Sequence, residues 1–165
     1  MTRSLLPALS TSLVGTHDSL RELQAQIPHH ALLAPRVSAS AIGWHIEHVA
    51  LTVDVFLKGL GRTDQGPYHP RPDPRKLLAL WIGWIPRGAV QSPASVRPSA
   101  PPDEQALLEH VERTESALGH LPSIPAEAWV KHPVLGPLRR DAVARFIDVH
   151  TRHHLKIVRD IRASI

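Results

Sequence analysis

Four long segments of this chain repeat their apolar residues with the spacing of an α-helix, and this pattern constrains the fold most. Apolar side chains recur at steps of three or four residues in the segments 4–26, 39–60, 102–120 and 138–163. Nowhere do apolar and polar residues alternate as is typical of a half-buried β-strand. Because each amphipathic helix must bury its apolar face, we expect an all-α fold, a four-helix bundle. The length of 165 residues predicts one domain over residues 1–165.

A long proline-rich connection joins the second predicted helix to the third. Residues 61–102 contain nine of the sixteen prolines, and we expect an ordered crossover that lets the two flanking helices run parallel. One short helix is expected inside it, capped by Asp73, started by Pro74 and ended by Pro86. The apolar run LLALWIGWI, residues 77–85, is too short to span a membrane and is expected to be buried.

Composition excludes several classes of function. The chain has no cysteine, so disulfides, iron–sulfur clusters and thiolate metal sites are excluded, and a cytoplasmic location fits this. Its net charge is +4, and its basic residues are scattered. Without a basic stripe and interleaved aromatic residues, we expect no nucleic-acid partner. The motifs G-x-S-x-G, H-E-x-x-H and the Walker loop are absent, but histidine occurs twelve times.

The last predicted helix carries two histidines in the middle of its apolar face. The apolar stripe consists of Val143, Phe146, Ile147, Ile157, Val158 and Ile161. On a helical wheel with about 100° per residue, His150 and His154 lie about 20° to either side of the centre of this stripe. His153 lies about 80° from the centre, at the edge. The sequence HTRHH therefore predicts an inward-facing H-x-x-x-H pair of His150 and His154, one turn apart.

The second predicted helix carries a comparable histidine. A seam with heptad spacing runs through Ala41, Trp44, His48, Leu51 and Val55. We expect this seam to be buried and His48 to point into the protein, with Ser38 or Ser40 as the N-cap of the helix. His45 lies on a neighbouring face, and we expect it to support the ligands by hydrogen bonding, or to be half-exposed, rather than to bind a metal itself.

These three histidines predict a metal site. A buried polar group without a partner costs about 1–3 kcal/mol, so three unpaired imidazoles would consume much of the stability of a domain. A divalent ion satisfies them, because imidazole nitrogen suits Zn²⁺, Ni²⁺, Cu²⁺ or Fe²⁺. Three histidines with an open fourth position are typical of a catalytic site. We therefore predict that His48, His150 and His154 bind one ion. The alternative is a metal-free core in which the histidines bond to carbonyl groups.

Other residues are candidates for the surroundings of this site. His132, in the segment KHPVLGPL, is expected in a loop before the last helix, with a pocket-lining position as the alternative. His153 and Trp44 are further candidates for the pocket. The four tryptophans are expected mostly in the core, with a pocket wall as the alternative. Glu47 and Asp148 adjoin predicted ligands but turn about 100° or more away from them, so neither is a clear general base.

Two motifs of the chain resemble a known family. WHIEHVAL on the second predicted helix and HTRHHLKIV on the last resemble the DinB/YfiT-like superfamily of metalloproteins. The segments WIPRGAVQSP and HPVLGPL look like an uncharacterised DinB-like branch. The resemblance covers nearly the whole chain and implies a divalent metal, Zn²⁺ or Ni²⁺, on the positions of His48, His150 and His154.

The resemblance has one departure that bears on substrate contacts. Many members read H-x-x-H-H-x-x-Q, whereas Ile157 stands here at the position of the glutamine. Characterised relatives include thiol-dependent S-transferases and an isomerase that uses mycothiol, in which the ion is thought to bind and activate a thiolate. The resemblance thus implies an enzyme that acts on a small molecule, with a low-molecular-weight thiol as a possible second cofactor.

Two classes of function follow as hypotheses. The first is a metal-dependent enzyme that transfers a thiol to an electrophile or hydrolyses its substrate; the missing general base favours the thiol. The second is a non-enzymatic, stress-related binding or interaction module with a structural or vestigial metal, and the aromatic crossover could then form a homodimer interface. An open coordination position favours catalysis, whereas a fourth protein ligand such as His45 or His17 favours a structural metal.

Overall fold

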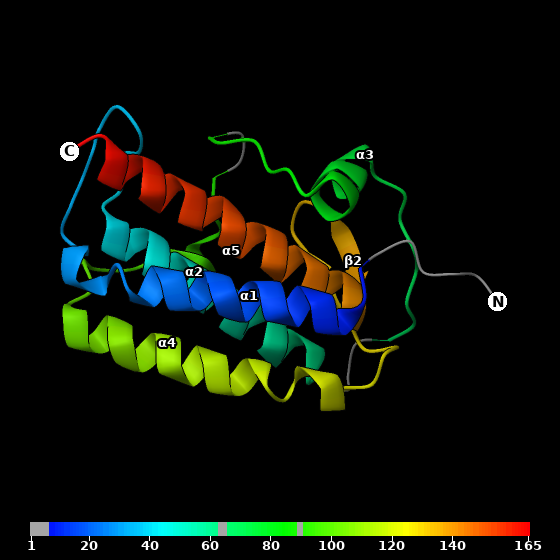
Figure 1. Cartoon of the computed structure of the whole chain (residues 1–165). Helices are drawn as coiled ribbons and strands as arrows, with labels where there is room; N and C mark the ends of the chain where they lie inside the picture. The colour runs from blue at the N-terminus through cyan, green and yellow to red at the C-terminus, as the bar shows by residue number, and fades with distance from the viewer. Residues whose placement is uncertain (1–6, 63–65, 89–90) are drawn as a thin grey trace.

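The computed structural model describes residues 7–62, 66–88 and 91–165, and these are mostly helical. Its long helices are α1 (Leu9–Gln24), α2 (Ile42–Leu60), α4 (Glu104–Leu118) and α5 (Arg140–Ala163). Helix α1 packs against α5 and α4, and α2 packs against α4 and α5 (Figure 1). The prediction of a helical fold is confirmed. The first three residues of the predicted segment 4–26 lie outside the described part of the chain.

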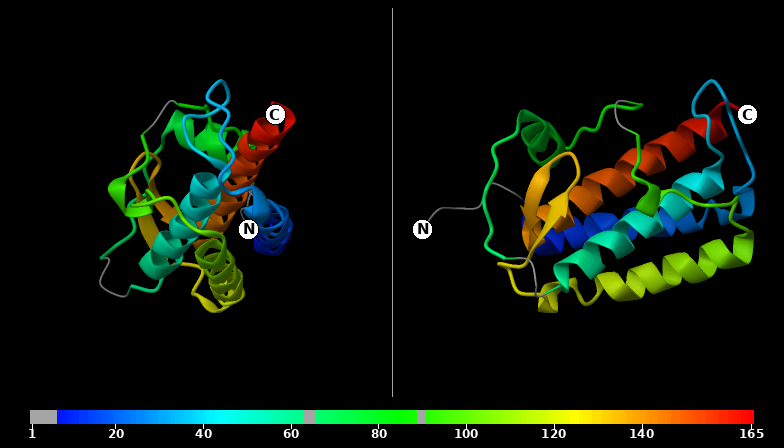
Figure 2. Two further views of the ribbon diagram at one scale, coloured as in Figure 1. Left: turned by 90° about the vertical axis from the view of Figure 1, so that its left-hand side faces the viewer. Right: turned by 180° about the vertical axis from the view of Figure 1, so that it is seen from behind.

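The helices run in two directions. In Figure 1, α1 and α5 run one way along the molecule, while α2 and α4 run the other way. The crossover between α2 and α4 lies on the side of α2 and α5, away from α1 (Figure 2). It spans the length of the molecule, and α2 and α4 are therefore parallel, as the long connection predicts.

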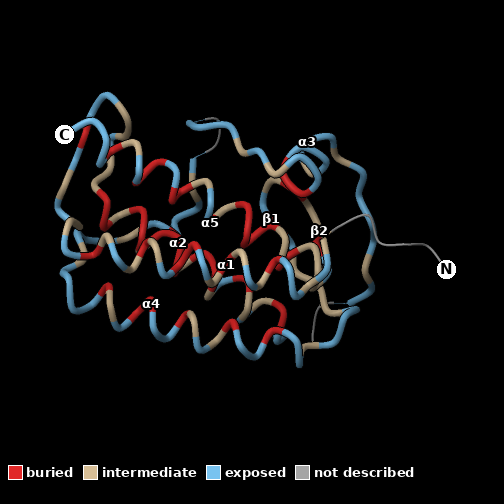
Figure 3. Tube along the Cα trace, in the orientation of Figure 1, coloured by how far each residue is buried: buried red, intermediate tan, exposed pale blue. Residues whose placement is uncertain are grey.

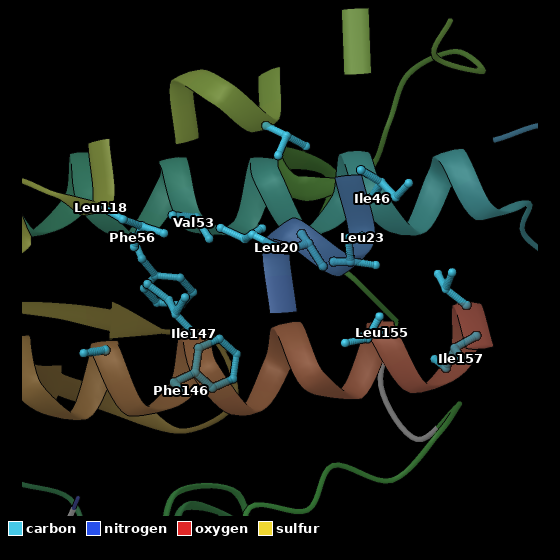
Figure 4. Close-up of a cluster of buried hydrophobic side chains, with 14 of the residues drawn as sticks. Leu20, Leu23, Ile46, Val53, Phe56, Leu118, Phe146, Ile147, Leu155 and Ile157 are labelled. Atoms are coloured by element: carbon cyan, nitrogen blue, oxygen red, sulfur yellow. The ribbon is translucent and has the colours of Figure 1, made fainter. Parts of the chain in front are cut away.

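The core forms where the apolar faces of the long helices meet (Figure 3). Leu23, Val49, Leu107 and Val158 are fully buried there, and Figure 4 shows part of this cluster. The predicted stripe of the last helix is buried along its length, from Val143 to Ile161. Folding removes these apolar faces from water, and this burial is the main contribution that stabilises the folded chain.

The prediction that the seam of the second helix is buried is wrong, because another face of the helix is buried. Val55 is exposed, and Ala41, Trp44 and Leu51 are only half-buried. The buried face of α2 is instead formed by Ile42, Ile46, Val49, Val53 and Phe56. Helix α2 packs between α4 and α5 and is also covered by the crossover and by a strand, so its buried face is wider than one seam. His48 is buried within it.

The short helix of the crossover is present but lies on the surface. It consists of α3 (Pro74–Leu77) and the π-helical turn η2 (Leu78–Ile82). The side chain of Asp73 accepts a hydrogen bond from the Arg75 amide, which confirms the predicted cap. The helix ends at Gly83, whose φ of 71° is left-handed, and not at Pro86.

The prediction that the run LLALWIGWI is buried is wrong. Trp81, Ile82 and Trp84 are 47%, 66% and 54% exposed, whereas Ala79 and Leu80 are buried. The segment packs on the outside of α5, and a single short helix in that position can bury only one face. Trp44 and Trp129 are half-buried, so the expectation that most tryptophans lie in the core is also wrong.

A small β-hairpin precedes α5, and the sequence does not predict it. Strands β1 (Trp129–His132) and β2 (Gly136–Arg139) pair antiparallel, with Val130 opposite Leu138. Each strand has four residues, too few to show a clear alternation, and Pro137 lies within β2. Gly136 has a φ of 74°, which suits the tight connection. The hairpin packs against α2 and α5.

Among the described residues, no helix has the length and the apolar character needed to cross a membrane.

Candidate metal centre

The structure brings His48, His150 and His154 together from two antiparallel helices. Helix α2 carries His48, and α5 carries the other two one turn apart. One ring nitrogen of each lies within 4.8 Å of one nitrogen of each of the others. The ring centroids are 4.6 to 5.0 Å apart. A tetrahedral zinc ion with bonds of about 2.0–2.1 Å holds its nitrogens about 3.4 Å apart. Small ring movements would therefore let the three share one ion.

His48 has the proton arrangement that a metal ligand needs. Its Nδ1 lies 2.7 Å from the carbonyl oxygen of Val96, which belongs to the short helix η3 (Ala94–Val96) of the crossover. Because a carbonyl only accepts, Nδ1 carries the proton and donates it, and Nε2 keeps a free lone pair. The indole of Trp44 stacks on the imidazole at 4.9 Å and 16°, so Trp44 holds the ring in place.

His154 is bonded to a second histidine. Its Nδ1 lies 3.0 Å from Nδ1 of His45, and Nε2 of His45 lies 2.9 Å from Oγ of Ser38. If His154 donates from Nδ1 to His45, and His45 donates from Nε2 to Ser38, then Nε2 of His154 is free to bind an ion. His45 is buried, not half-exposed, and is hydrogen-bonded to the candidate ligand His154. In this arrangement both of its nitrogens are used, so it is not an available fourth ligand.

Ser38 does not cap α2, contrary to one sequence expectation. The cap position is Ala41, and it makes no side-chain cap bond. The hydroxyl of Ser38 instead accepts a bond from the Ser40 amide and contacts the His45 ring. The serine lies seven residues before His45, and no motif in the sequence indicates this contact.

The imidazole ring of His150 makes no hydrogen bond with the described part of the chain. Its ring lies between His48 and Phe146, at 5.0 and 5.4 Å, and it retains an intermediate exposure. The buried polar atoms that lack a partner within the described ranges belong to Ser12, Gln26, Glu115 and Thr151. No ring nitrogen of the cluster is among them, so the free nitrogens of the cluster remain in contact with accessible space.

The whole cluster is electrically neutral at physiological pH. Burial is the main cause that lowers the pKa of His48, and it holds the pKa values of His150 and His154 well below their usual range. Burial also lowers the pKa of His45 to about 4. Neutral imidazole is the form that binds a metal, so the donor set, its protonation and its tautomers all fit a divalent ion.

Within the described ranges, no carboxylate joins the cluster. Glu47 turns to the other side of α2 and accepts from His110. Asp148 is bonded by Arg145 and Arg152. Because both carboxylates are bonded to other residues, neither is available as a general base. The sequence likewise indicates no clear general base. His17 lies 3.9 Å from Glu115 on α4, and it is not in the group of described residues that could share one ion.

His132 and His153 lie at the border of the cluster. His132 ends β1 and is buried, not in a loop as the sequence predicts; the hairpin packs it against Phe56 and Phe146. His153 is half-buried at the edge of α5, as predicted, and its ring meets that of His154 edge-on at 5.1 Å. Burial lowers the pKa of each to about 4.

Comparison with known proteins gives one match. A family model described as the DinB superfamily matches residues 12–158. This range includes all three histidines of the candidate centre, together with the hairpin and the crossover. No curated protein and no solved structure matches the chain. Ile157, at the position where the sequence departs from the family pattern, belongs to the apolar core.

Proposed function

The chain belongs to the DinB superfamily, and from this premise we propose that it is a divalent-metal-dependent enzyme whose ion is held by His48, His150 and His154. The observation that carries the proposal is the convergence of three neutral imidazoles from two helices at one point. The hydrogen bonds of His48 to Val96 and of His154 to His45 support it, because they leave one nitrogen of each ring free.

The three histidines would hold the ion and leave a position open for a further ligand. When bound by neutral ligands only, a Zn²⁺ or Ni²⁺ ion keeps its full charge, and it favours a thiolate or lowers the pKa of a bound water. His45 and Ser38 orient His154, and Trp44 and Val96 orient His48. His45 is bonded to His154 and Ser38, and His17 faces Glu115 and is not in the group that could share an ion. This supports an open position and hence catalysis rather than a structural ion.

Among metal-dependent reactions, we favour transfer of a low-molecular-weight thiol to a small electrophile over hydrolysis. Hydrolysis usually needs a base to take a proton from water. The nearest sequence candidates, Glu47 and Asp148, are bonded elsewhere. A thiol needs less help, because its sulfur loses its proton more readily than water does. A cytoplasmic location, where such thiols stay reduced, is part of the proposal.

Metal analysis tests the site. The protein is purified without a nickel column, and its metal content is measured by mass spectrometry. We expect about one ion per chain, and a strong loss in His48→Ala and His154→Ala. His153→Ala is the matched control, because it removes a neighbouring imidazole that is not a proposed ligand. A wild-type protein that holds no ion and cannot be loaded with Zn²⁺ or Ni²⁺ refutes the proposal.

Activity assays then test the reaction. The loaded protein is incubated with a set of low-molecular-weight thiols and electrophilic acceptors, and thioether formation is followed. We expect turnover with at least one thiol, and none in His150→Ala. Turnover of ester or amide substrates without a thiol would favour hydrolysis instead.

A second candidate function has an observation of its own. Leu77, Trp81, Ile82 and Trp84 form an exposed apolar surface on the crossover, which is unusual for a chain that acts alone. This surface supports the proposal that the chain is an interaction module, in which a second copy of the chain covers these residues. Sedimentation of the wild type against Ile82→Glu tests it: we expect a dimer that the variant splits. A monomeric wild type removes this candidate.

A further inference from the structure

The tautomer of His132 is fixed by the hairpin. Its Nδ1 lies 3.0 Å from the backbone amides of both Val134 and Leu135, and each amide donates to it. A nitrogen that accepts two N–H groups carries no proton of its own. The neutral ring must therefore carry its proton on Nε2, on the edge that faces away from the turn. His132 is thus a hydrogen-bond donor at Nε2.

The orientation of this donor is fixed as well. The imidazole stacks on Phe56 at 5.5 Å and 17°, and the ring of Phe146 meets it edge-on at 4.5 Å. The residue is 9% exposed. Burial lowers its pKa to about 4, and a second proton would have to sit on Nδ1, against the two amides. The ring therefore stays neutral and donates only from Nε2.

This donor has no acceptor within the protein as far as the chain is described. None of the described residues accepts a bond from Nε2 of His132. The residue lies close enough to His150 to lower its pKa, and Phe146 contacts both rings. Nε2 of His132 is not among the buried side-chain atoms that lack a partner, so this donor is accessible. Its position beside a candidate metal ligand makes it available to a partner from outside the chain.

We propose that His132 donates a hydrogen bond from Nε2 to an anionic ligand that occupies the open position of the ion. This inference rests on the proposed metal site. The ring N–H groups assigned to two of the ligands cannot bind this anion, because that of His48 donates to Val96 and that of His154 donates to His45. His132 adds a donor of fixed direction, which selects a ligand with a negatively charged acceptor atom, such as a thiolate or a carboxylate, over a neutral one.

The competing explanation is that His132 only closes the hairpin turn. Two variants separate the roles. In His132→Asn the amide oxygen can take the place of Nδ1 and accept from the turn, but the donor at the Nε2 position is lost. In His132→Gln the side-chain nitrogen reaches about as far as Nε2, but the acceptor for the turn is lost. A structural role is therefore weakened mainly in the glutamine variant, and a ligand-binding role mainly in the asparagine variant.

Cobalt and azide supply the test. Each protein is loaded with Co²⁺, whose visible spectrum reports the coordination of the ion, and is titrated with azide as the anionic probe. We expect His132→Asn to bind Co²⁺ about as well as the wild type. We expect its azide affinity to fall about tenfold to a hundredfold, the usual contribution of a hydrogen bond to a charged group. His132→Gln should retain more of the azide affinity and have the lower unfolding temperature.

The outcomes separate the two proposals. Unchanged azide affinity in a Co²⁺-loaded, folded His132→Asn refutes the role of His132 and leaves the metal site standing. Loss of azide affinity in His132→Gln alone assigns His132 to the turn and also refutes it. Failure of the wild type to bind Co²⁺ refutes the metal site, and with it this inference.

Discussion

His110 on α4 is clamped between two carboxylates of α2, and this contact predicts a stability that depends on pH. Its Nδ1 lies 3.0 Å from both carboxylate oxygens of Glu47, and its Nε2 lies 2.9 Å from Oδ2 of Asp54. Carboxylates only accept, so both nitrogens donate and the ring is an imidazolium. The hydrogen bonds to Asp54 and Glu47 raise the pKa of His110 to about 9.

The size and sign of the effect follow from the raised pKa. A shift from 6.5 to about 9, at about 1.4 kcal/mol for each unit, limits the contribution of His110 to the free energy of unfolding to about 3 to 4 kcal/mol. The Asp54 side chain is 45% exposed, and solvent screens that pair, so we expect about 2 kcal/mol. This stability is fully present below pH 6.5 and is lost as the pH rises through about 9.

The histidines around the candidate metal centre act in a different pH window. The pKa values of His45, His132 and His153 are lowered to about 4. They therefore contribute stability above pH 6.5 that is lost as the pH falls toward 4. Above about pH 7 their contribution changes little, and the change up to pH 9.5 belongs to the His110 contact.

Urea unfolding checks this prediction. The free energy of unfolding is measured at pH 7.0, 8.0 and 9.5, above the range in which the histidines with lowered pKa titrate, with a chelator in every sample so that metal binding does not contribute. We expect the wild type to lose more than half of the His110 contribution, about 1 kcal/mol, across this range. His110→Gln should be less stable at pH 7.0 and nearly independent of pH. His120→Gln is the control, because His120 is exposed beyond the end of α4. Equal slopes in the wild type and His110→Gln would contradict the reasoning.

Two further predictions concern the packing around the centre. His45→Ala removes the partner of His154 and should weaken Zn²⁺ binding about tenfold to a hundredfold without abolishing it. Competition with a chromophoric chelator measures this, and an unchanged affinity would show that His45 does not orient the ligand. Gly15→Ala would place a methyl group 2.7 Å from a carboxylate oxygen of Asp148 and should cost about 1–3 kcal/mol in thermal unfolding. In Gly61→Ala the nearest atom is 3.7 Å away, so equal losses in both would contradict the steric explanation.

Local periodicity is enough to predict the long helices and the approach of the three histidines. The stripe of α5 contains His150 and His154 because residues four apart lie on the same helical face. His48 lies on a second helix of the same core, and two apolar faces that pack together bring their central side chains close. The same reasoning fails on α2, where Val55 is exposed, because α2 is covered from several sides and its buried face does not follow one seam. It also fails on the crossover, where an apolar run lies on the surface.

The positions of the protons depend on contacts that no local pattern contains. His48 donates to a carbonyl 48 residues away, and His45 meets His154 across 109 residues. His132 obtains its tautomer from a hairpin that the sequence does not predict. Backbone carbonyls and amides are the same at every residue, so only the folded chain selects which of them meets a given imidazole. That selection leaves free nitrogens for an ion and a free donor beside it.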